Sequence, residues 1–185
     1  LEREAFRAGE MPSYENTFRR LHLNQWTEQD VRWLPMDRYD EAEPFAEFDG
    51  RPCWGGLDLA STTDIAAFVL VCPDDEGGID VLPTFWIPAE NARLRERRDR
   101  VPYEAWIKQG LIRATEGDVI DFNQIREDIL KMHEQYNIQD IAVDRWNSTS
   151  LVTDLEAENV KIAMFGQGFR SMSAPSKDLE ALVMG

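Results

Sequence analysis

The sequence has 185 residues, a hydrophobic content of 43% and a formal net charge of −15 at pH 7. This length suits one core domain with an appendage, and the longest apolar run, residues 65–72, is far too short to span a membrane. The acidic balance excludes a domain that holds nucleic acid on a broad basic face. It does not exclude a nuclease, because carboxylates that bind divalent metal ions add negative charge themselves.

The two ends and the two cysteines give further expectations. The chain starts at Leu1, stops at Gly185 and carries no signal-peptide pattern, so we expect part of a longer intracellular protein. Cys53 and Cys72 fit no metal-ligand spacing, and two histidines do not complete a structural zinc site with them. We therefore expect two free, buried thiols on neighbouring strands in a reducing compartment.

The chain divides near residue 45. Residues 1–45 hold charges, aromatic side chains and prolines without a sustained strand pattern, so we expect an ordered arm or linker rather than a separate domain. Residues 46–185 form the predicted core domain, which opens with three strands at 53–60, 64–73 and 79–88. The short turns between these strands imply antiparallel neighbours.

Helices alternate with strands in the second half of the chain. The predicted elements are helices at 90–100 and 101–110, a small hairpin at 111–121, a helix at 121–136, a strand at 138–144, a helix at 148–159, a strand at 160–168 and a helix at 175–185. Helices between the later strands imply parallel neighbours with right-handed crossovers. The predicted fold is therefore α/β: a mixed sheet of three antiparallel strands plus parallel strands, flanked by helices.

Two aspartates follow the strand pattern in the same way. Asp58 lies near the carboxyl end of the first strand, and Asp144 ends the strand with the sequence IAVD. Ligands of open α/β sheets bind outside the carboxyl ends of the strands, so the two carboxylates meet if their strands are adjacent and parallel. Neighbouring carboxylates repel unless a cation is present, and divalent ions prefer oxygen ligands. Asp64 is close enough in sequence to join them. The simpler alternative is that each aspartate forms a turn or caps a helix.

Several segments resemble a known family. The stretches GGLDLASTTDIAAFVLV, IAVDRWN and MFGQGFRSMSAPSKDLEALVMG resemble the nuclease domain of tailed-phage and prophage terminase large subunits. The stretch NTFRRLHLNQWTEQDVRWLPMDRYD is similar to the segment that joins the ATPase motor of that family to its nuclease. The resemblance implies a ribonuclease H-like fold and a metal-dependent endonuclease, with two Mg²⁺ or Mn²⁺ ions, that cuts concatemeric viral DNA during packaging.

The resemblance also assigns site residues and partners. It places the first and second metal-binding acids of the family at Asp58 and Asp144, with Asp64 as an accessory acid. The third acid of the family lies past a further hairpin, so neither Asp178 nor Glu180 is assigned, and the activity of this piece alone stays open. Double-stranded DNA, the terminase small subunit and the portal protein are the implied partners, and the host cytoplasm is the implied location. No G-x-x-x-x-G-K-[ST] loop occurs, so ATP hydrolysis is not expected.

Weaker candidates for contact with DNA are Arg145, Asn147, Lys177 and Arg97. Arg97 belongs to the one basic cluster of the chain, five arginines between residues 93 and 100. For each of these residues the alternative is a helix cap or a solvated surface, which is the usual role of charge runs.

Two other functions stay open at this point. The stretch GLDLASTTD is also similar to the first phosphate loop of actin-like and sugar-kinase-like ATPases, although their second lobe and second Asp-Gly-rich loop are not found. A catalytically inactive ribonuclease H-like module that docks partners is the non-enzymatic alternative. Nucleotide binding would support the first alternative, and failure to bind manganese would support the second.

Overall fold

The structure is a computed structural model, and it describes residues 2–25, 34, 50–59, 63–144 and 149–184. The chain divides into two compact units, one formed by residues 1–44 with 169–185 and the other by residues 45–168. The helices of the first unit are α1 (Glu2–Glu10), α2 (Pro12–Leu23) and α8 (Phe169–Met184). None of the helices in the described ranges combines the length and the apolar content that a membrane span requires.

Helices α1 and α2 were not predicted from the sequence pattern. A proline at the first helical position opens α2, where its missing N–H costs nothing. The helix ends at Asn24, which adopts a left-handed conformation with φ of 50°. The two helices are joined by a hydrogen bond of 2.7 Å from the Tyr14 hydroxyl to Glu4 Oε2, and the Arg7 guanidinium lies 4.2 Å from the centre of the Tyr14 ring.

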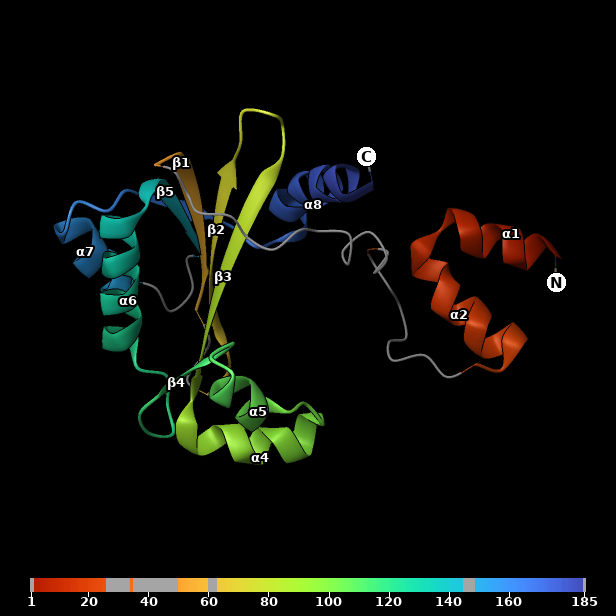
Figure 1. Ribbon diagram of the computed structural model, residues 1–185, viewed down its shortest axis with the longest axis horizontal. Helices are drawn as coiled ribbons and strands as arrows, with labels where there is room; N and C mark the ends of the chain where they lie inside the picture. The colour runs from red at the N-terminus through yellow and green to blue at the C-terminus, as the bar shows by residue number, and fades with distance from the viewer. Residues whose placement is uncertain (1, 26–33, 35–49, 60–62, 145–148, 185) are drawn as a thin grey trace. The chain divides into compact units, whose positions relative to one another are not determined.

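The second unit is built on a six-stranded sheet with the order β4-β3-β2-β1-β5-β6 (Figure 1). Its strands are β1 (Pro52–Asp58), β2 (Ala66–Pro73), β3 (Ile79–Pro88), β4 (Arg113–Thr115), β5 (Asn137–Asp144) and β6 (Ile162–Phe165). The pairs β1/β2 and β2/β3 are antiparallel, whereas β1/β5, β5/β6 and β3/β4 are parallel. The predicted mixed sheet of three antiparallel strands plus parallel strands is confirmed.

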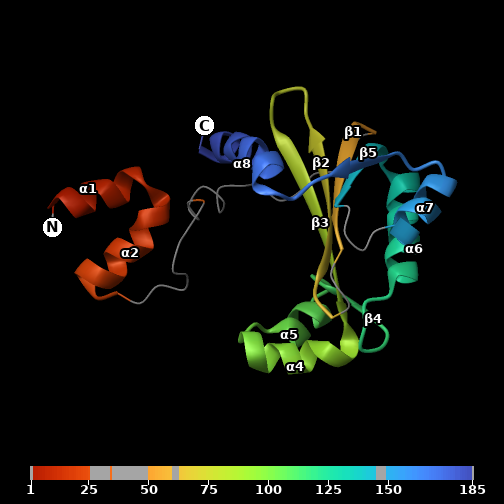
Figure 2. The same ribbon diagram turned by 180° about the vertical axis from the view of Figure 1, so that it is seen from behind.

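Two helices cover one face of this sheet. Both views show α6 (Phe122–Gln135) and α7 (Thr149–Ala157) along the same side of the strands (Figures 1 and 2). The Asp121 side chain caps α6 by accepting from the backbone N–H groups of Asn123 and Gln124. The apolar stripe of α6 is buried against the sheet, at Ile125, Ile129 and Met132.

The strands alternate between this covered face and the opposite one. On β1, Leu57 is 3% exposed and belongs to the core beneath α6, whereas Trp54, Gly56 and Asp58 are exposed. Because side chains in a strand alternate between faces, these three residues lie on the face away from α6 and α7. A smaller apolar cluster lies on that opposite face, where Phe85 and Ile87 of β3 pack with Ala92 of α4 (Ala89–Asp99) and Tyr103 of α5 (Tyr103–Lys108).

Two predicted elements differ from the structure. Residues 113–115 form no hairpin but pair in parallel with the end of β3, because α4 and α5 make a crossover that returns the chain in the same direction. Helix α8 begins at Phe169 rather than at residue 175, and Pro175 lies inside it. A proline inside a helix removes one backbone hydrogen bond, which the surrounding turns of α8 accommodate.

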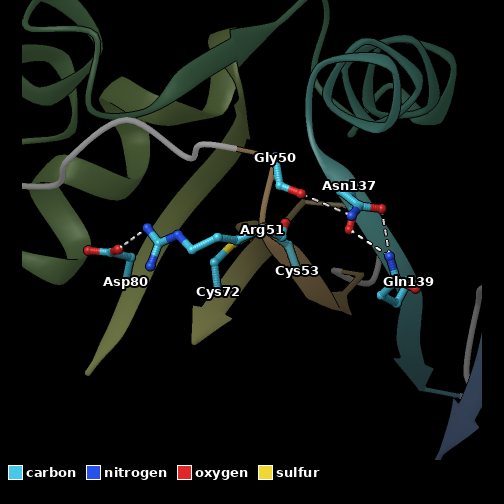
Figure 3. The surroundings of a disulfide bond; sticks show 7 residues. All are labelled: Gly50, Arg51, Cys53, Cys72, Asp80, Asn137 and Gln139. Carbon is cyan, nitrogen blue, oxygen red and sulfur yellow. Dashed lines mark hydrogen bonds and ion pairs between the residues drawn. A yellow bond between two sulfur atoms is a disulfide. The ribbon is translucent and has the colours of Figure 1, made fainter. Parts of the chain in front are cut away.

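The expectation of free thiols was wrong, because Cys53 and Cys72 form a disulfide bond (Figure 3). Trp54 and Val71 are Cα partners in the antiparallel pair. Cys53 precedes Trp54 and Cys72 follows Val71, so the two cysteines lie opposite each other, with their Cα atoms 4.3 Å apart. Both cysteines are fully buried. The strand register, which the sequence pattern did not specify, decides this pairing.

Candidate active site

The two strand-end aspartates lie at neighbouring positions of the sheet. The last Cα partners of the parallel pair are Leu57 of β1 and Val143 of β5, and Asp58 and Asp144 are the next residues on the two strands. The predicted placement of these aspartates on adjacent parallel strands is confirmed. Both strands end at the same edge of the sheet, which is where ligands of such sheets bind.

Both aspartates face away from α6 and α7. Leu57 and Val143 are almost fully buried in the core, so alternation directs the next side chain on each strand to the opposite face. Asp58 is exposed and Asp144 is half-buried. The residues preceding them on this face, Gly56 and Ala142, are small and are Cα partners of each other. A Cβ built at Gly56 would meet no described atom within 4 Å, so space is left beside the acids.

A glutamine contacts the first aspartate. Gln167 follows β6 and donates a hydrogen bond of 3.0 Å from Nε2 to Oδ1 of Asp58. β6 is parallel to β5, so the residues that follow both strands arrive at the edge that carries the acids. The sequence analysis predicted no contact between Gln167 and the acids. Gln167 nevertheless lies just after a parallel strand, which is the pattern that identified Asp144 as a candidate.

Asp64 has a different environment. Its Oδ1 accepts hydrogen bonds from Nη1 of Arg95 on α4, over 2.6 Å, and from the backbone N–H of Ile65, over 2.8 Å. The hydrogen bond from Arg95 is the main cause that holds the pKa of Asp64 below its ordinary value. The Asp64 side chain therefore pairs with α4, and in the described part of the chain no three acidic, histidine or cysteine side chains gather as a metal site.

Arg95 is the centre of a polar network on α4. It is 13% exposed and also donates to the backbone carbonyl of Thr63, over 3.0 Å, and to Asp99, over 3.3 Å. Asp99 in turn accepts hydrogen bonds from Arg98 and from the Tyr103 hydroxyl. The hydrogen bond from Arg98 is the main cause that lowers the pKa of Asp99 to about 2.

Two of the candidates for contact with DNA lie in the described part of the chain, on different helices. Arg97 is exposed on α4, in the second unit, and Lys177 is exposed on α8, in the first unit. Arg145 and Asn147 lie outside the described residues. Asp178 and Glu180, which sequence analysis left unassigned, are also on α8.

The two aspartates have the chemistry of a site for a hard divalent cation. Ionised carboxylates only accept, and Mg²⁺ in proteins is bound by one or two carboxylates while it keeps several waters. The exposed Asp58 and the open space at Gly56 fit a hydrated ion on this face. In the described part of the chain, Asp58 accepts one hydrogen bond, which comes from the neutral amide of Gln167 and does not neutralise its charge.

A mixed six-stranded sheet with this strand order, covered by helices, is the fold of a terminase nuclease domain. The family model described as "Terminase large subunit, endonuclease domain" matches residues 3–185, and the chain belongs to this family. The chain is 33% identical to the terminase large subunit of Enterobacteria phage HK97 over its whole length, and 24% identical to Protein YmfN of Escherichia coli (strain K12) over 91% of its length. It spans 37% and 40% of the length of these relatives.

The structural comparison agrees with the sequence comparison. The crystal structure of the HK97 bacteriophage large terminase matches with a TM-score of 0.76 and 33% sequence identity. This match covers 98% of the present chain and 38% of the HK97 chain. The resemblance inferred from the strand-end motifs is therefore confirmed.

Proposed function

We propose that this chain is a metal-dependent DNA endonuclease domain that cuts concatemeric viral or prophage DNA during genome packaging. The observation that carries the proposal is the placement of Asp58 and Asp144 at the neighbouring ends of the parallel strands β1 and β5. Membership of the terminase nuclease family supports the same activity. Mg²⁺ or Mn²⁺, as a pair of ions, is the proposed cofactor.

Asp58 and Asp144 are the proposed metal ligands. When bound, a pair of divalent ions activates a water and stabilises the leaving oxygen of a phosphodiester. The pairing of β1 with β5 holds the two carboxylates at a fixed spacing, and Gln167 orients Asp58 through its hydrogen bond. Asp64 is the proposed accessory acid, which acts through Oδ2, because Arg95 and Ile65 both engage Oδ1.

The proposal extends to partners and to the organisation of the chain. Double-stranded DNA is the proposed substrate, with Arg97, Lys177, Arg145 and Asn147 as candidate contacts. The similarity to a phage large terminase supports the terminase small subunit and the portal protein as partners, and the host cytoplasm as the location. Residues 1–45 are the proposed connection to an ATPase motor, and residues 46–185 are the proposed nuclease domain.

Plasmid cleavage tests this function. In protein extended to include the third acid of the family, we expect Mg²⁺ or Mn²⁺ to support nicking and linearisation, and Ca²⁺ not to, because its looser coordination positions the attacking water poorly. Asp58→Asn and Asp144→Asn should abolish cleavage, since each removes a charge that holds a metal ion. Asp140→Asn is the matched control, because Asp140 is exposed on the same strand and the same face as Asp144.

Two results would redirect the proposal. Cleavage that survives both substitutions at Asp58 and Asp144 would place the reactive site elsewhere. A folded protein that binds no manganese and cuts no DNA would support the inactive docking module instead.

A further inference from the structure

A pocket lies between α4 and the segment that leads into β2. It has a volume of about 230 Å³ and is lined by Thr63, Asn91, Leu94, Arg95 and Arg98. We propose that this pocket binds a backbone phosphate of the DNA strand that the candidate nuclease site holds, a few nucleotides from the bond to be cut. This inference rests on the proposed function and names a contact that neither the family match nor the strand-end motifs assign.

The basic wall of the pocket is one face of a helix. Asn91, Arg95 and Arg98 are separated by four and three residues, so they lie above one another on α4. Thr63 supplies the opposite wall, and the bond from Arg95 to its carbonyl ties the two walls together. The Arg95 part of the pocket is therefore held by contacts between elements, whereas the Arg98 side chain is 69% exposed and bonds Asp99.

Both guanidinium groups bond carboxylates, and each keeps N–H groups without a described hydrogen-bond partner. Arg95 uses Nε and Nη1 for Asp99, Asp64 and the Thr63 carbonyl, which leaves both N–H groups of Nη2 without a described partner. Arg98 bonds Asp99 through Nε and Nη2, which leaves Nη1. Arginine presents five N–H donors in a planar arrangement that matches the geometry of phosphate. A guanidinium group that is already held in position loses less side-chain entropy when it binds.

The charges around the pocket set its strength. The carboxylates of Asp64 and Asp99 accept hydrogen bonds from these two arginines. Two positive and two negative charges therefore offset each other, so free phosphate should bind weakly. A phosphate in a DNA strand that is already bound arrives at high effective concentration, so a weak contact still contributes.

The register of the sheet relates the acid pair to the strand that packs against α4 and α5. Asp58, Ala67 and Phe85 are successive Cα partners across β1, β2 and β3, on the face opposite α6. Phe85 packs against the cluster formed by α4 and α5. Neighbouring strands are about 4.8 Å apart, so Asp58 lies roughly 10 Å from the strand that carries this cluster. The axial rise of about 3.4 Å per nucleotide is a lower limit on the spacing of phosphates along one strand, so this separation corresponds to at most about three nucleotides.

Arg93 provides a matched control on the same helix. Like Arg98 it is exposed and pairs with a carboxylate, that of Glu104 over 3.4 Å, but it does not line the pocket. Arg93→Gln and Arg98→Gln remove the same charge from the same segment. A general electrostatic effect would weaken DNA binding equally in both variants, whereas a phosphate site in the pocket would distinguish them.

The test is DNA binding by the full chain, measured by fluorescence anisotropy of a labelled duplex in Ca²⁺ over a range of salt concentrations. We expect Arg98→Gln to weaken binding about 3- to 10-fold at low salt and to reduce the slope of log K against log salt by about one. Arg98→Lys should restore the slope but only part of the affinity. Arg93→Gln should leave both nearly unchanged. Equal effects of Arg93→Gln and Arg98→Gln, or no effect of Arg98→Gln, would overturn the inference.

Two further measurements distinguish a failure of this inference from a loss of the fold and from a failure of the proposed function. Thermal unfolding identifies a variant that has lost its fold, in which case Arg98→Lys, which keeps the charge, decides the inference. Metal-dependent cleavage is measured on the same proteins. If the parent protein neither binds Mn²⁺ nor cuts DNA, the proposed function fails, while the salt slope of Arg98→Gln still decides whether the pocket binds phosphate.

Discussion

Gln167 donates a hydrogen bond from Nε2 to Oδ1 of Asp58 over 3.0 Å, across 109 residues of sequence. The bond joins the segment after β6 to the end of β1, although β5 lies between these two strands in the sheet. A side chain that crosses a strand in this way restricts the orientation of the Asp58 carboxylate. We infer that Gln167 is a positioning residue for the proposed metal ligand.

Replacing this glutamine should weaken metal binding without unfolding the protein. We expect Gln167→Ala to reduce Mn²⁺ affinity roughly tenfold, which is typical when a partner of a metal ligand is removed. Gln167→Glu should lower the melting temperature without metal, because it sets a second carboxylate against Asp58, and Mn²⁺ should recover the loss. Gln139→Ala is the control, since Gln139 on β5 bonds Asn137 instead. Equal effects at positions 139 and 167 would contradict the positioning role.

Two adjacent glycines on β1 test the packing on each face. A Cβ at Gly55 would lie 2.7 Å from Phe68 Cε2 and 3.0 Å from Ile141 Cγ1, both in the buried core, whereas a Cβ at Gly56 would meet no described atom within 4 Å. Gly55→Ala should therefore lower the free energy of unfolding by about 1–3 kcal/mol. Gly56→Ala should change it by less than about 0.5 kcal/mol. Urea unfolding measures both, and equal losses would show that the faces are not packed as described.

The disulfide between Cys53 and Cys72 should stabilise the fold. It closes a loop across a sequence separation of 19 residues, for which the loss of chain entropy in the unfolded state corresponds to about 3 kcal/mol. We expect reduction, or the double substitution Cys53→Ala with Cys72→Ala, to lower the free energy of unfolding by about this amount. Thiol titration of protein denatured without reductant checks the bond itself. Two reactive thiols per chain would contradict the disulfide.

The network on α4 predicts a dependence of stability on pH. The pKa of Asp99 falls from its ordinary value of 3.8 to about 2 in the folded protein, mainly through the hydrogen bond from Arg98. A lowered folded-state pKa stabilises the fold above the unfolded pKa, and this contribution is lost as the pH falls from about 4 to about 2. The difference in melting temperature between the parent and Asp99→Asn should be constant above pH 5 and shrink below pH 4. A difference that stays constant down to pH 2 would exclude this contribution.

Much of the sheet could be predicted from local sequence patterns. The short turns after residues 60 and 73 determine antiparallel pairing of the first three strands, and the helices that separate the later strands determine parallel pairing. These two rules predict that the strands ending at Asp58 and Asp144 run in the same direction, and the structure shows that the two strands are neighbours. The candidate acid pair therefore depends on the strand order, which the short patterns alone left open.

Features that depend on register or on distant contacts could not be predicted in the same way. The Cys53–Cys72 bond requires a particular alignment of β1 with β2, and the pairing of Asp64 with Arg95 requires α4 to lie against the start of β2. The parallel pairing of residues 113–115 with β3 depends on how two short helices turn the chain. None of these contacts has a periodic signature in the sequence.

Manganese binding tests the central claim most directly, because it examines the proposed ligands without requiring turnover. The full chain, freed of metal, is titrated with Mn²⁺, and the electron paramagnetic resonance signal of the free ion gives the bound fraction. We predict that the parent and Asp140→Asn bind Mn²⁺ alike, and that Asp58→Asn and Asp144→Asn each lose about tenfold or more in affinity. If all four proteins bind Mn²⁺ equally, or if the folded parent binds none, Asp58 and Asp144 are not the metal ligands of this domain.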